Sequence, residues 1–147
     1  MGFLSNLLGK NGSQARQALG NLENKDLMQA IVYGCYYIAA ADGELEPSEV
    51  EKVSSLLANN PKLQGFGAEL HACVDKARAD FEQGGARVIR MNALRELADV
   101  KHSQDQAETV LVMMLTTAEA DGEIEPAEME ALERAAQTLG LSLKQYL

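Results

Sequence analysis

A fourteen-residue segment occurs twice in this chain, and the duplication limits the folds that the chain can adopt. Ala39–Lys52 reads AAADGELEPSEVEK, and Ala118–Ala131 reads AEADGEIEPAEMEA. Nine of the fourteen positions are identical at a constant offset of 79 residues. A helical apolar pattern lies on both sides of each copy, so the repeat predicts two copies of one helix–loop–helix unit.

The spacing of apolar residues predicts an all-α fold of about seven helices. The two repeats become helical hairpins at residues 25–58 and 104–138. Neither hairpin is large enough to bury its own apolar face, so we expect them to pack around a pseudo-two-fold axis as a four-helix core. Two further helices, separated at Gly84–Gly85, would cover its flank, and the apolar run Val110–Leu115 predicts a helix surrounded on all sides.

The length of 147 residues suits a single domain, which we assign to residues 23–147. Residues 1–22 are expected to be flexible or weakly helical, because several glycines interrupt their apolar pattern. No run is long and apolar enough to span a bilayer, so we expect no direct membrane insertion and a cytoplasmic location.

The negative charge of the chain is concentrated in the repeats. Residues 42–51 hold five acidic residues and residues 119–130 hold six, with no Lys or Arg in either stretch. These 11 acids exceed the formal net charge of −9, so the rest of the chain sums to +2. Such acidity argues against nucleic acid as a partner, because nucleic-acid binding requires clustered Lys and Arg.

Alternating carboxylates in a tight turn are the ligands that a hard divalent cation prefers. We therefore predict cation binding at both acidic turns, with Ca²⁺ favoured and Mg²⁺ and Mn²⁺ as alternatives of the same class. The EF-hand pattern does not fit, because glycine stands at the second loop position rather than the sixth. The candidate metal ligands are Asp42, Glu44, Glu46 and Glu49 in the first turn and Asp121, Glu123, Glu125 and Glu128 in the second.

A structural interpretation competes with the metal site. Acids in a first helical turn interact favourably with the helix dipole, and a Glu at the third helical position often reaches back to the cap. That role accounts for Glu49 and Glu128 but leaves the other acids repelling one another. Because the pattern occurs twice without a basic residue inside either stretch, we favour the cation site.

The doubled helix–Asp-Gly–helix unit, with a Glu seven positions after each Asp, resembles the TerB family of bacterial tellurite resistance proteins. The resemblance covers about residues 22–147, and its motifs are Asp42, Gly43 and Glu49 together with Asp121, Gly122 and Glu128. It implies an all-helical fold of two hairpins and a divalent-metal site in the acidic patch. It also implies a place in a tellurite and chemical stress system, with partners that include a membrane-embedded component. The four glutamates between the motif residues rest on the charge argument alone.

Three classes of function follow from these observations. We favour a non-enzymatic, cation-binding sensor or scaffold that meets the inner face of the membrane only through a partner protein. The first alternative is a metal-independent interaction module that docks a basic partner on its acidic face. A metal-dependent hydrolase is less favoured, because no nucleophile or base accompanies the carboxylates.

Overall fold

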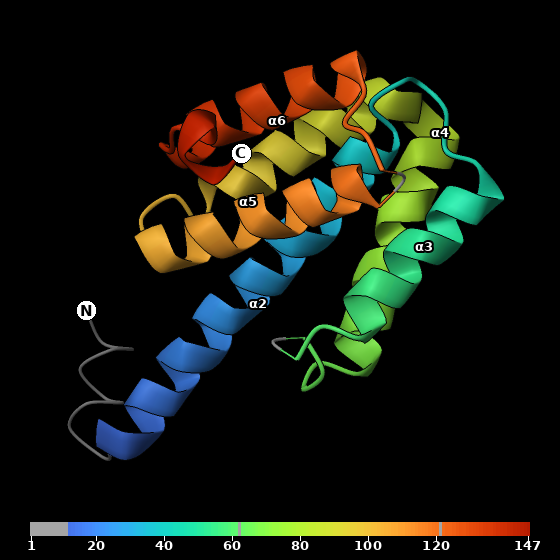
Figure 1. Ribbon diagram of the computed structural model, residues 1–147. Coiled ribbons are helices and arrows are strands. Elements are labelled where there is room, and N and C mark those ends of the chain that lie inside the picture. Colours follow the sequence, from blue (N-terminus) through green and yellow to red (C-terminus); the bar gives the residue numbers. More distant parts are fainter. Residues whose placement is uncertain (1–11, 62, 121) are drawn as a thin grey trace.

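The computed structural model describes residues 12–61, 63–120 and 122–147, and within these ranges the chain is entirely helical. Five α-helices and one 3-10 helix follow one another along the chain (Figure 1). They are α2 (Gly12–Ala39), α3 (Pro47–Ala58), α4 (Ala68–Ala98), α5 (Gln104–Glu119), α6 (Pro126–Leu139) and η1 (Leu143–Tyr146). None of the described helices combines the length and hydrophobicity needed to cross a bilayer.

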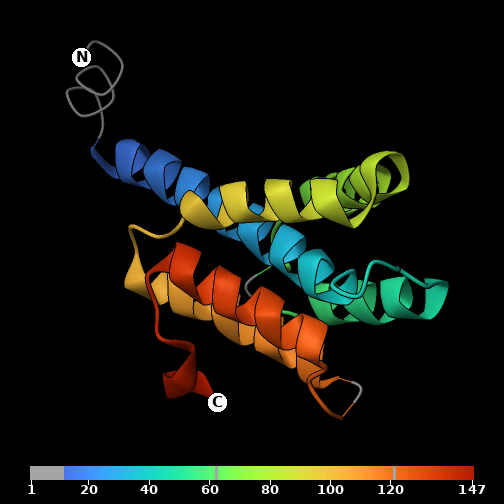
Figure 2. The same ribbon diagram turned by 90° about the horizontal axis from the view of Figure 1, so that it is seen from above.

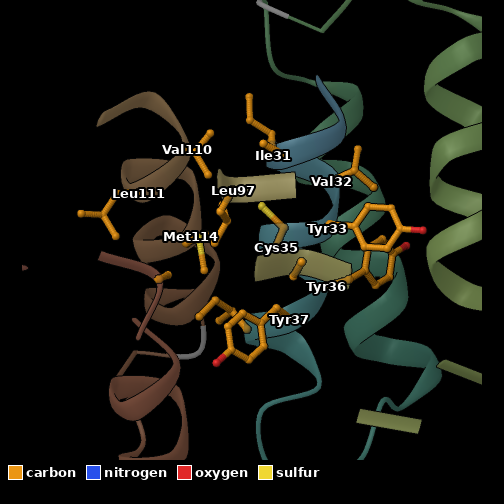
Figure 3. Close-up of a cluster of buried hydrophobic side chains, with 14 of the residues drawn as sticks. Ile31, Val32, Tyr33, Cys35, Tyr36, Tyr37, Leu97, Val110, Leu111 and Met114 are labelled. Carbon is orange, nitrogen blue, oxygen red and sulfur yellow. The ribbon is translucent and has the colours of Figure 1, made fainter. Parts of the chain in front are cut away.

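Helix α2 is the centre of the fold, and its second half is buried on every side. Every residue from Ala30 to Ala40 except Gly34, which packs in the core, has an apolar or aromatic side chain. Less than a tenth of the surface of each of these residues is exposed. Three tyrosines lie in this stretch, and Figure 3 shows Tyr33 and Tyr36 on one side of α2 and Tyr37 pointing away from them. Helices α3, α4, α5 and α6 all contact α2, so both halves of the chain share one core.

Local signals fix where the helices begin and end. Pro47 and Pro126 stand at the first positions of α3 and α6, where a missing N–H donor costs nothing. The Ser103 hydroxyl caps α5 by accepting a hydrogen bond from the Gln106 backbone N–H at 3.4 Å. Gly140 ends α6 in the left-handed conformation, with φ 75°. These boundaries agree with the sequence patterns.

Helix α4 bends sharply at Gly85, which has φ 73° and ψ −165° (Figures 1 and 2). This region of backbone space is open almost only to glycine. Asp80, before the bend, accepts a hydrogen bond at Oδ2 from the amide of Asn92, after the bend, at 3.0 Å. The same oxygen accepts one from the Tyr33 hydroxyl of α2 at 2.6 Å. The bend is therefore tied to the central helix.

Three sequence expectations differ from the structure. The surrounded helix is α2 rather than α5, because the side chain of Val112 within the Val110–Leu115 run is 48% exposed. Helix α2 begins at Gly12 rather than near Lys25, and residues 1–11 lie outside the described part of the chain. The expected third and fourth helices follow each other directly as the two arms of α4, with the expected break at Gly85, and the described chain has five α-helices and one 3-10 helix instead of about seven helices. The pseudo-two-fold relation of the hairpins stays a prediction.

Candidate functional site

The first acidic turn joins α2 to α3 and is closed by local hydrogen bonds. Gly43, with φ 94°, donates its backbone N–H to the Ala40 carbonyl at 2.9 Å. The carboxylate of Asp42 accepts a hydrogen bond from the Glu44 backbone N–H at 3.0 Å. An Asp oxygen that bonds the backbone two residues later stabilises a turn, so Asp42 has a structural role here.

Glu49, at the start of α3, also stabilises the first acidic turn. Its carboxylate accepts a hydrogen bond from the backbone N–H of Glu46, the residue that precedes the helix, at 3.4 Å. This is the back-reaching half of a capping box, which satisfies a donor left over at the helix start. The side chains of Glu44 and Glu46 are exposed to solvent.

The second acidic turn, between α5 and α6, repeats this geometry. Gly122 has φ 102° and donates to the Glu119 carbonyl at 2.9 Å. Glu128 accepts a hydrogen bond from the Glu125 backbone N–H at 2.9 Å. The residues before the two helices have nearly equal dihedral angles, φ −73° and ψ 154° at Glu46 and φ −73° and ψ 158° at Glu125. Asp121 lies outside the described residues, and the Glu123 side chain is exposed.

Both turns lie at the same end of the molecule (Figures 1 and 2). Glu49 and Glu128 border one shallow hollow of about 70 Å³, between the end of α2, α3 and the facing ends of α5 and α6. The hollow is also lined by Lys52 and Thr117, which the sequence patterns did not single out. Lys52 could have been identified from its helical position, because it stands three residues after Glu49 and residues three apart share a helix face.

The seven described candidate ligands do not form a preassembled metal centre. Within residues 12–61, 63–120 and 122–147, no three His, Cys, Asp or Glu side chains come together in a way that could hold a metal ion. Asp42, Glu49 and Glu128 each use an oxygen to hold local backbone. The arrangement offers a cation a set of carboxylates around two turns that border one shared hollow.

The two cysteine thiols are unsuited to redox or nucleophilic chemistry. Both are buried, and burial is the main reason why the pKa of each rises to about 12. Cys35 donates weakly from Sγ to the Met113 carbonyl at 3.8 Å, inside the core. A reactive thiol needs exposure and a lowered pKa, and neither cysteine has them.

Residues 28–146 match the model of the family described as tellurite resistance protein TerB. The chain belongs to the TerB family. The match includes α3, α5 and α6 in full and both acidic turns, so the resemblance seen in the repeated motif is confirmed. Neither the curated proteins nor the solved structures include a significant match to the chain.

Proposed function

We propose that this TerB-family chain is a non-enzymatic component of a tellurite and chemical stress resistance system that binds divalent cations weakly at its two acidic turns. Ca²⁺ is the favoured ion, and Mg²⁺ and Mn²⁺ share its preference for oxygen ligands. The bound ion would set the charge of an acidic face on which partner proteins dock, among them a membrane-embedded component.

One observation carries this proposal: two turns far apart in the chain match in the backbone of their glycines and of the residues before their helices, and they border a common hollow. The dihedral angles before the two helices differ by only a few degrees, and Glu49 and Glu128 face the same space. Helix capping explains two glutamates per turn, because Glu46 and Glu49 form a reciprocal capping box and so do Glu125 and Glu128. Capping does not account for Glu44 and Glu123, which are exposed and cap no helix. Their charges repel the neighbouring acids unless a cation or a basic partner is present.

The ion would be held weakly, because no three described ligands are already gathered and several oxygens are engaged with backbone. Gathering flexible, solvated side chains costs conformational entropy before any ion contact is made. Open sites of this kind fall at the weak end of the calcium range, with dissociation constants of about 10⁻⁵ to 10⁻³ M.

Metal-independent docking of a basic partner is the second candidate, and a specific observation favours it. The described carboxylates are spread over the surface rather than converging, which suits a complementary charged partner as well as an ion. A metal-dependent hydrolase is less favoured: His71 and His102 are exposed on α4 and on the turn after it, and both thiols are buried.

Thermal unfolding with calcium separates the candidates. About 10 mM Ca²⁺ acting on a site with a dissociation constant of about 1 mM adds roughly 1.4 kcal/mol, or a rise in Tm of about 3–6 °C. The reference is the same chain at equal ionic strength in KCl. Docking without metal predicts equal Tm values in the two salts.

Two double variants make the assignment specific. Glu44→Gln with Glu123→Gln removes one exposed acid from each turn without touching a capping glutamate, and it should abolish most of the calcium-dependent rise. Asp99→Asn with Glu133→Gln removes the same charge from exposed positions outside the turns and should leave the rise intact. An equal loss in both pairs would show a general charge effect and contradict the proposal.

A further inference from the structure

A polar cavity, distinct from the hollow that Glu49 and Glu128 border, lies between the end of α2 and the turn after it, the second half of α4 and the first turns of α6. Its volume is about 230 Å³. Three arginines line it, Arg87 and Arg90 from α4 and Arg134 from α6, together with Tyr37 and Glu130. The chain has only 13 Lys and Arg residues and a net charge of −9, so three arginines around one cavity make a basic island on an acidic protein.

The positive charge of this cavity is poorly compensated by the protein itself. Glu130 is its one acidic lining residue, and its Oε1 atom lies 3.9 Å from Arg134 Nη2. Both side chains are largely solvent-exposed, at 77% for Glu130 and 48% for Arg134, so their attraction is screened. In the ranges that the structure describes, Arg87 and Arg90 form no ion pair. Three arginines and one glutamate line the cavity, so its lining carries a formal excess of two positive charges.

The backbone and the small side chains explain why the cavity exists. Arg87 and Arg90 are three residues apart on α4, so they lie on one face, and the bend at Gly85 immediately precedes them. The remaining lining residues are all alanines, from α4, α6 and the turn after α2, and they leave open space that larger side chains would fill. The helices therefore place the three arginines around a hollow.

Tyr37 brings a neutral donor to the same space. Its side chain is 6% exposed and it lines the cavity. Burial raises the pKa of its hydroxyl, and the nearby Arg134 and Arg90 guanidinium groups oppose that rise. The hydroxyl thus stays protonated at neutral pH beside two permanent positive charges.

We propose that this cavity binds a small, doubly charged oxyanion such as phosphate, held by Arg87, Arg90 and Arg134. The planar guanidinium group presents paired N–H donors that match the oxygens of such an anion. The volume exceeds that of a single water site, which needs about 10–15 Å³, and is below the roughly 300 Å³ at which pockets for drug-sized ligands begin. Two excess positive charges equal the charge of the anion.

Inorganic phosphate is the direct probe, titrated into the ¹⁵N-labelled full chain with EDTA present and the ionic strength held constant with NaCl. EDTA removes divalent cations, so failure of the cation proposal would not affect this experiment. We expect amide shifts concentrated at residues 86–90 and 127–134 that saturate in the millimolar range. Unmoved amides through about 20 mM phosphate, far above a millimolar dissociation constant, would overturn the proposal.

Substitutions identify the groups responsible. Arg87→Gln and Arg90→Gln should each weaken phosphate binding by about tenfold or more, because each removes a charge-assisted hydrogen bond. Arg95→Gln removes the same charge from an exposed position in the last turn of α4, outside the cavity, and should bind phosphate like the parent. Equal weakening by Arg95→Gln would overturn the proposal in favour of general charge attraction.

Two further arms sharpen the assignment. Glu130→Gln should strengthen binding, since it removes the one carboxylate at the cavity, and a weakened affinity there would contradict the site. A parallel titration with tellurite, the oxyanion named in the family description, distinguishes the source of the ligand. A response to both anions supports a general oxyanion site, and a response to phosphate alone supports a site that rejects tellurite. A response to tellurite without one to phosphate would contradict the phosphate site.

Discussion

Tyr33 links the central helix to the bent one through a single half-buried carboxylate. Its hydroxyl donates to Asp80 at 2.6 Å, and its ring packs in the core beneath the Lys76 ammonium, which lies 5.8 Å from the ring centroid. Burial first, and then the Asp80 hydrogen bond and charge, raise the pKa of this tyrosine above its ordinary value, so it remains a donor throughout the neutral range.

Tyr33→Phe should therefore destabilise the chain by about 1.5 kcal/mol, because it removes a hydrogen bond to a charged acceptor while the ring still packs. Urea unfolding measures the loss. Tyr37→Phe is the matched control, since the Tyr37 hydroxyl makes no hydrogen bond within the described residues, and it should change stability much less. Equal losses in the two variants would contradict the role given to Asp80.

Glu96 gives a prediction with a defined pH dependence. Burial, followed by the charge of Asp99, raises the pKa of this half-buried carboxyl, so the folded state binds its proton more tightly than the unfolded state does. The associated stability is fully present below the unfolded pKa, near 4.5, and is lost as the pH rises through the folded pKa.

At pH 7, Glu96→Gln should consequently raise the free energy of unfolding, by up to about 0.5 kcal/mol after allowance for solvent screening. Denaturant unfolding of the variant and the parent measures the difference, which should shrink toward zero below about pH 4. A variant that is less stable than the parent at pH 7 would show that the ionised carboxyl is stabilised by its neighbours.

At the scale of the elements, the bend in α4 depends on one glycine. Gly85 has φ 73° and ψ −165°, and no heavy atom lies within 4 Å of where a Cβ would stand. Gly85→Ala should destabilise the chain by about 1–3 kcal/mol from backbone strain alone. Gly65→Ala has equal space and no positive φ, so its Tm should stay within about 2 °C of the parent. Similar Tm values for the two variants would contradict the strain.

Several elements could be predicted from sequence because their signals are local. Pro47 and Pro126 at helix starts, Ser103 as a cap and Gly140 as a stop require only the residues of one or two turns. The break at Gly85 was also predictable from the local sequence, because glycine readily adopts a backbone conformation that other residues avoid.

The arrangement of the helices could not be predicted in this way. The tyrosines of α2 carry hydroxyl groups and make the buried second half of this helix look amphipathic, whereas the Val110–Leu115 run looks buried and exposes Val112. Which helix is central depends on how many neighbours surround it, and that is a property of tertiary packing.

In the candidate site, too, local roles were predictable from the sequence and contacts between distant segments were not. The capping role of Glu49 and Glu128 followed from their position in the helix, and the structure confirms it. The shared hollow beside Lys52 and the arginine cavity join residues from distant segments, which no local pattern brings together.

At the scale of the whole molecule, charge is segregated. Acidic residues surround the two turns, and three arginines line a cavity that also takes residues from the first turns of α6. Glu128 borders the hollow while Ala127 and Glu130 border the cavity, so one helix start carries both features. A protein that meets partners through charge gains specificity and association rate from such a pattern.

Amide NMR during a calcium titration tests whether the duplicated acidic turns bind a divalent cation. At constant ionic strength, we expect saturable shifts in the millimolar range at residues 40–49 and at 119–128, with little change in the remaining amides. Spectra that stay unchanged through about 10 mM Ca²⁺, or that shift uniformly as they do with KCl, would contradict this binding.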